Sequence, residues 1–213
     1  MQFLQLFDVV LVEAYLRQCR VRNTLVESDT HVPPTPEETK MLMAYLSDLG
    51  LKPAIVGSVG ILHHLGPDID PANDFRPTVD LDVWVPRVPP PPPGWSRDME
   101  AIGTHSWISP SGGYVDFIEA GHAFPDGYVN PKSIEYDQPS LSGPYPVAAA
   151  LTILKMKLSS LRAKDLSDSI ALVRKMGRVP SAGELGKLNS TQKENMEMLQ
   201  QWFKHRPHGK YGE

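Results

Sequence analysis

Two aspartates, Asp80 and Asp82, stand one residue apart in a segment that alternates between apolar and polar residues. The alternation over residues 78–85 predicts a strand with both carboxylates and Trp84 on one face. Like charges this close repel, and each raises the pKa of the other, a cost that a divalent cation removes. Mg²⁺ prefers carboxylate oxygens together with substrate phosphates. The spacing therefore predicts a magnesium site on this strand.

A third carboxylate, Asp116, lies in a second strand-like segment, residues 114–119, which follows a Gly-rich turn and is predicted to form a hairpin with residues 106–108. If this strand pairs beside the first, opposed side chains come within about 5 Å. Three carboxylates could then hold two ions, which would stabilise both the attacking and the leaving oxygen of an in-line phosphoryl displacement. Asp116 would be the general base for the incoming hydroxyl.

Gly57 and Ser58 separate a short apolar segment, residues 53–57, from a helix expected over residues 58–65. Glycine lets the backbone approach a phosphate closely, and a helix N-terminus presents free N–H groups to an anion. The alternative is that Ser58 is an ordinary N-cap. These two residues are candidates for phosphate binding.

A basic segment near the C-terminus holds Lys157, Asp165 and Asp168. In one unbroken helix, Lys157 and Asp168 would lie about 16 Å apart along the axis, so they can meet at one ligand only if the helix breaks. Asp165 as an N-cap, with Asp168 three residues later, would mark such a break. We expect a helix–turn–helix here; the alternative is a solvated amphipathic helix.

The remaining pattern predicts the elements that must position these residues. Helices are expected over residues 2–20, from Thr35 with Pro36 and Glu38 as a capping box to Gly50, and from residue 146 onward. The expected fold is α/β (α+β), with a mixed sheet flanked by helices over residues 1–145 and a C-terminal helical region over 146–213. We read His63 and His64 as surface or groove residues, and Trp84 as a core residue or a base-stacking one.

The charge is unevenly spread. Residues 1–150 carry 9 Lys and Arg against 19 Asp and Glu, and residues 151–213 carry 12 against 6. The basic part could face phosphates or nucleic acid, or could simply be solvated. A single cysteine, Cys19, excludes an intrachain disulfide framework and a multi-cysteine zinc site. No apolar run approaches the roughly 20 residues of a membrane span, so we expect a cytoplasmic protein without membrane contact.

The overall pattern resembles the nucleotidyltransferase superfamily with the DNA polymerase β-like fold. It consists of Gly57-Ser58, the Asp80–Asp82 pair and Asp116. The Arg-x-Thr-x-Asp-x-Asp motif that begins at Arg76 is similar to that of AbiEii-type nucleotidyltransferases, which include toxins of toxin–antitoxin systems. A C-terminal signature of that family is similar to Lys155-Met-Lys157-Leu158 followed by Arg162-Ala-Lys164-Asp165-Leu166-Ser-Asp168.

The resemblance implies transfer of a nucleoside monophosphate from a nucleoside triphosphate (NTP), with release of pyrophosphate. It implies that Ser58 grips the triphosphate, that Lys157 or Lys155 neutralises phosphate charge, and that Asp165 or Asp168 supports the site. Arg76 would pair with a carboxylate or a substrate phosphate. The acceptor could be tRNA, a protein or a small hydroxylated molecule, and a cognate antitoxin could bind the enzyme. A glycosyltransferase and a non-catalytic nucleotide-binding module are the other readings.

Overall fold

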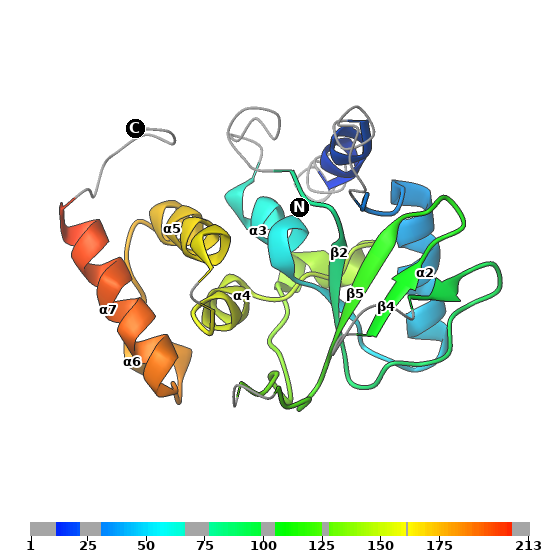
Figure 1. Ribbon diagram of the computed structural model, residues 1–213. Coiled ribbons are helices and arrows are strands. Elements are labelled where there is room, and N and C mark those ends of the chain that lie inside the picture. The colour runs from blue at the N-terminus through cyan, green and yellow to red at the C-terminus, as the bar shows by residue number, and fades with distance from the viewer. Residues whose placement is uncertain are drawn as a thin grey trace.

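A mixed sheet lies at the centre of the computed structural model, with helices on both of its sides (Figure 1). The structure describes residues 12–21, 31–66, 77–98, 105–124, 128–160 and 162–205. Helix α2 lies on one side of the sheet, and α3 with the C-terminal helices lies on the other (Figure 1). This arrangement confirms the expected α+β fold class.

Five strands form the sheet among the described residues, in the order β1-β2-β5-β4-β3. Strands β2 and β5 pair in parallel, and the other neighbours pair antiparallel. The central parallel pair joins segments more than 30 residues apart in sequence, and it sets the register of the acidic residues. The strands are β1 (Ala54–Ile55), β2 (Leu81–Val85), β3 (Ser96–Arg97), β4 (His105–Ile108) and β5 (Tyr114–Glu119).

The strand expected over residues 53–57 is shorter than predicted. Strand β1 ends at Ile55, and helix α3 (Gly57–Leu65) begins two residues later. Gly57 has φ +59°, which turns the chain out of the sheet, while the Val56 N–H still donates to the Asp82 carbonyl. The turn therefore lies directly against the acidic strand.

The acidic strand also begins later than the alternation predicted. Strand β2 starts at Leu81, so Asp80 precedes it. Val79, which was expected on the apolar face, is 38% exposed. Trp84 is only 5% exposed, and its indole N–H donates to the Pro131 carbonyl. These contacts support the core role for Trp84 over base stacking.

Helix α2 (Pro36–Asp48) begins with the predicted capping box. The Thr35 hydroxyl accepts from the Glu38 N–H, and the Glu38 carboxylate accepts from the Thr35 N–H. The same carboxylate accepts from the hydroxyls of Ser109 and Ser111 beside the β4–β5 turn. Glu38 therefore fixes the end of the β4–β5 hairpin as well as its own helix.

The first predicted helix is confirmed where the structure describes it, over residues 12–21; its earlier part lies outside the described residues. The helical region expected from residue 146 onward begins at Ala150, four residues later than predicted, and the chain breaks between α4 and α5. No helix in the described ranges is long and apolar enough to cross a membrane. The helical elements here are η1 (Gln138–Ser142), α4 (Ala150–Lys157), α5 (Ala163–Met176), α6 (Ala182–Leu185) and α7 (Ser190–His205).

Candidate active site

Three carboxylates meet at the centre of the sheet. Asp82 on β2 is the direct partner of Asp116 on β5 in the parallel register, and Asp80 immediately precedes β2. Paired residues on neighbouring strands point to the same face, so both side chains project from one surface of the sheet. All three line one cavity of about 860 Å³. The structure thus brings together the three aspartates singled out from the sequence.

The electrostatics of this cluster favour a bound cation. Burial, together with the charge of Asp80, raises the pKa of Asp82 to about 7. Burial also raises the pKa of Asp116, even though the Ser106 hydroxyl donates to its Oδ1. The donors are oxygen atoms of the kind that hard divalent cations bind. These carboxylates therefore fit Mg²⁺, whose charge would offset both the burial and the mutual repulsion that raise these pKa values.

Asp80 and Asp116 each have a hydroxyl that orients them. The buried Thr78 hydroxyl lies 3.0 Å from Asp80 Oδ1 and 3.1 Å from the Asp80 carbonyl, and Ser106 performs the same task for Asp116. Neither was identified from the sequence as a site residue. The signal for Ser106 was its place on the strand expected to pair with residues 114–119, directly opposite Asp116.

Gly57 approaches the carboxylates so closely that no other residue fits. A Cβ atom at this position would overlap the Asp82 carboxylate, and the positive φ adds strain for any L side chain. Ser58 is the second residue of α3 and is buried. The N-cap is Val56, without a side-chain hydrogen bond, so the reading of Ser58 as an N-cap is wrong. The N–H groups of the first turn therefore lie at the cavity wall formed by Gly57 and Ser58.

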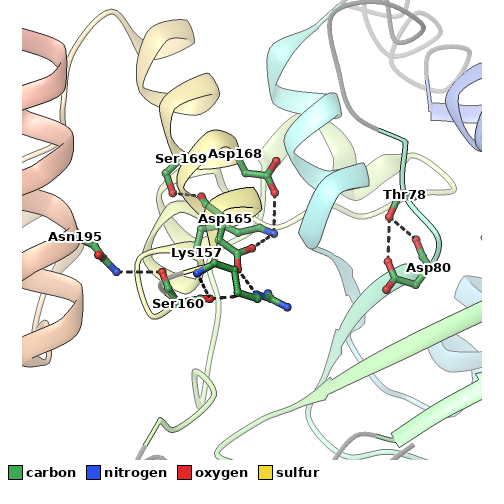
Figure 2. Close-up of polar contacts among 9 residues, drawn as sticks. Thr78, Asp80, Lys157, Ser160, Asp165, Asp168, Ser169 and Asn195 are labelled. Carbon is green, nitrogen blue, oxygen red and sulfur yellow. Dashed lines mark hydrogen bonds and ion pairs between the residues drawn. The ribbon is translucent and has the colours of Figure 1, made fainter.

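Lys157, the last residue of α4, also lines the cavity. Its Nζ lies 2.8 Å from Asp165 Oδ1 and 2.9 Å from Asp168 Oδ2 (Figure 2). Burial alone would lower the pKa of Lys157, but the charges of Asp168 and Asp82 outweigh it and raise that pKa. The attraction to Asp82 links the basic wall to the acidic cluster. Lys155, the other candidate, is not among the residues that line the cavity.

Asp165 and Asp168 lie on α5, with side chains 0% and 2% exposed. The predicted break before α5 is confirmed, but Asp165 is not the N-cap; Arg162 occupies that position. The Asp165 carboxylate accepts from Lys157 and from Arg162 Nε, and the Lys157 hydrogen bond helps to lower the pKa of Asp165 against the effect of burial. Its side chain therefore positions Lys157 instead of capping α5.

A residue of α7 stabilises the turn between α4 and α5. Asn195 Nδ2 on α7 donates to the Leu158 carbonyl and to the Ser160 carbonyl, and Figure 2 shows the second of these bonds. These bonds satisfy backbone groups that the end of α4 leaves without helical partners. They hold the turn in the form that lets Lys157 reach α5.

Two predictions about other residues have different outcomes. Arg76 lies outside the described residues. His63 is not the surface or groove residue expected from the sequence, because it is only 8% exposed and its Nε2 lies 2.8 Å from Asp137 Oδ2. His64 is partly exposed. His64 Nε2 lies 2.7 Å from the Ala148 carbonyl oxygen. Both rings therefore connect α3 to the segment that precedes α4.

The comparisons with known proteins identify a fold. No family model matches the sequence, and no curated protein matches it. A solved structure, that of an antigenic nucleotidyltransferase-like protein from Paracoccidioides brasiliensis, superimposes with a TM-score of 0.51 at 17% identity. The match covers 80% of this chain and 90% of that one. At this identity the likeness shows a shared fold, so the chain has a nucleotidyltransferase-like fold.

Proposed function

We propose that this protein is a magnesium-dependent nucleotidyltransferase, which moves a nucleoside monophosphate from an NTP to a hydroxyl acceptor. The observation that carries the proposal is the convergence of Asp80, Asp82 and Asp116 with the Gly57 turn and Lys157 in one cavity. The fold shared with a nucleotidyltransferase-like protein supports it. Two carboxylates alone would suit many metal-dependent enzymes. A third carboxylate lies beside them, and so does a helix N-terminus that could bind a phosphate. Together these features favour phosphoryl transfer from an NTP.

The three aspartates would hold the metal. Bound there, Mg²⁺ supplies positive charge that stabilises the charge developing on the oxygens around phosphorus. The acceptor oxygen forms a bond to the α-phosphorus, and the bond from that phosphorus to the bridging oxygen breaks. Pyrophosphate leaves with the electron pair of that bond. The proton of the acceptor hydroxyl passes to an Asp116 carboxylate oxygen, which Ser106 Oγ orients by hydrogen bonding to the same side chain.

The remaining residues bind the triphosphate. The free N–H groups at the start of α3 would donate hydrogen bonds to the triphosphate oxygens, and no side chain stands in the way because residue 57 is glycine. Lys157, which lines the same cavity, supplies a positive charge, and Asp165 and Asp168 fix the position of that charge. Lys157 binds these two carboxylates tightly, so an arriving triphosphate would share the ammonium group with them.

For the acceptor we propose RNA, with the 3′ end of tRNA as the first candidate and a toxin role with a cognate antitoxin as the biological setting. The excess of Lys and Arg over residues 151–213 supports this choice, because phosphate contacts dominate the affinity of proteins for nucleic acid. Arg162 and Lys164 from this region line the cavity itself.

The test is incubation with each α-labelled NTP, Mg²⁺ and either total RNA or soluble protein, with separation of labelled products by size. We expect labelled RNA with the wild-type protein and none with Asp80→Ala, whose fold should be unchanged. Asp48→Ala, a substitution of an exposed aspartate at the end of α2, is the matched control and should label RNA normally. Undiminished labelling by Asp80→Ala would refute the proposal.

A further inference from the structure

One wall of the cavity is aromatic, and neither the carboxylates nor Lys157 require it. We define the aromatic cluster as His122, Phe124 and Tyr128, all of which line the cavity. The rings of His122 and Phe124 meet edge to face at 4.9 Å between centroids. Those of Phe124 and Tyr128 lie 5.8 Å apart and only 25° from parallel. All three residues are partly exposed and line the cavity, so a ligand there can reach parts of their rings.

Backbone and side-chain contacts hold the cluster in place. The Phe124 N–H donates to the Tyr128 carbonyl, and the Asn130 N–H donates to the His122 carbonyl. The buried Asn130 side chain donates to the carbonyl of Glu119, the last residue of β5. His105, the first residue of β4, meets His122 at 6.4 Å between ring centroids. The cluster is therefore anchored to both β4 and β5.

Its position relative to the carboxylates identifies what it would contact. The phosphate-binding groups stand on the β2 side, because α3 packs on β2 and α4 packs on α3. The aromatic cluster is attached to β5 and β4, which follow β2 in the sheet order. In an in-line transfer the attacking and leaving oxygens lie on opposite sides of phosphorus. With pyrophosphate on the β2 side, an acceptor hydroxyl in line with it would approach from the side of β5 and β4, where the aromatic cluster lies.

We propose that the aromatic cluster is the acceptor subsite, where an unpaired nucleobase at the 3′ end of a single-stranded RNA stacks. This inference rests on the proposed function, because only that function says where the acceptor hydroxyl must lie. Unpaired bases stack on aromatic side chains irrespective of sequence. Arg162 and Lys164, which line the same cavity, supply charges for the phosphates on the 5′ side of the terminal nucleotide.

The experiment measures binding separately from chemistry. A short fluorescent RNA with a single-stranded 3′ end is titrated with protein in EDTA and without NTP, and its anisotropy gives Kd. Phe124→Leu keeps an apolar side chain but removes the π face, and it should weaken RNA binding about 5- to 150-fold, the range found for loss of one stacked base. Phe124→Tyr should bind as the wild type does. Phe203→Leu on α7, outside the cavity, is the matched control.

A second titration, of Mg²⁺ and a non-hydrolysable NTP, separates the possible outcomes. We expect the same NTP affinity for Phe124→Leu and wild type. Loss of NTP affinity or an unchanged RNA affinity in Phe124→Leu would overturn the proposed subsite. So would a preference of the wild-type protein for a protein or small-molecule acceptor. If wild-type protein transfers nothing to any acceptor yet Phe124→Leu weakens RNA binding, the proposed function fails and the ring–RNA contact stands. Tyr128→Leu repeats the test if Phe124→Leu does not fold.

Discussion

Replacing Asp82 with asparagine should stabilise the metal-free protein, even though it removes a proposed metal ligand. The pKa of Asp82 is about 7 in the folded chain, against an ordinary value of 3.8. Between these values the folded state holds a proton that the unfolded state has released. The free energy of unfolding therefore falls as pH rises through this window. At 1.36 kcal/mol per pKa unit, the full effect is about 4 kcal/mol.

The repulsion among the three carboxylates is shared, so not all of this free energy belongs to Asp82 alone. We therefore expect Asp82→Asn to gain about 2–4 kcal/mol at pH 8, or about 4–10 °C in Tm for a chain of this size. Because the wild-type penalty shrinks as Asp82 becomes protonated, the difference should fall by more than half at pH 5. Asp48→Asn, which changes the net charge equally at an exposed site, should shift Tm little.

The assay is thermal unfolding followed by circular dichroism at pH 8 and pH 5, in EDTA and in excess Mg²⁺. Mg²⁺ should raise the Tm of the wild type and have a smaller effect on Asp82→Asn, because a ligand that binds only the folded state stabilises it. Equal Tm values for the two proteins at pH 8 in EDTA would refute the reasoning. So would a difference that does not shrink on acidification.

Three further substitutions test the parts that surround the carboxylates. Gly57→Ala should cost at least about 1–2 kcal/mol, because of the positive φ and the overlap with Asp82, and should abolish NTP binding measured by calorimetry. Lys157→Met should cost about 3–5 kcal/mol in urea unfolding at pH 7.5, because it leaves Asp165 and Asp168 buried without their cation; a loss below 1 kcal/mol would contradict that contact. Thr35→Ala should cost about 1 kcal/mol by the same measurement, through loss of the N-cap of α2, and should leave NTP binding unchanged.

The acidic cluster could be predicted from the sequence because its signals are local. A strand alternates with period two, so Asp82 could be assigned to one face, and Gly57 before a helix marked the turn that we propose binds phosphate. What the sequence could not supply was the parallel pairing of β2 with β5. That register depends on a connection of about 30 residues, which includes β3 and β4.

The errors in prediction lie where distant contacts override local preference. Asp165 looks like an N-cap three residues before Asp168. Its role depends instead on Lys157 and on the turn that Asn195 holds from α7. His63 was expected at the surface or in a groove because two adjacent histidines do not share a helix face, and its partner Asp137 lies 74 residues away in the sequence.

The aromatic cluster escaped prediction for a related reason. Its residues lie in a segment without helical or strand periodicity, and short backbone contacts between Phe124 and Tyr128 bring the rings together. The proposed division of the chain at residue 145, and the cytoplasmic setting, stay predictions.

The most direct test of the central claim is a crystal structure with Mg²⁺ and a non-hydrolysable NTP. We predict Mg²⁺ about 2.1 Å from oxygens of Asp80, Asp82 and Asp116, with the phosphates at the start of α3 and near Lys157. A metal ion bound elsewhere, such as between His63 and Asp137, or a nucleotide outside this cavity, would contradict the account.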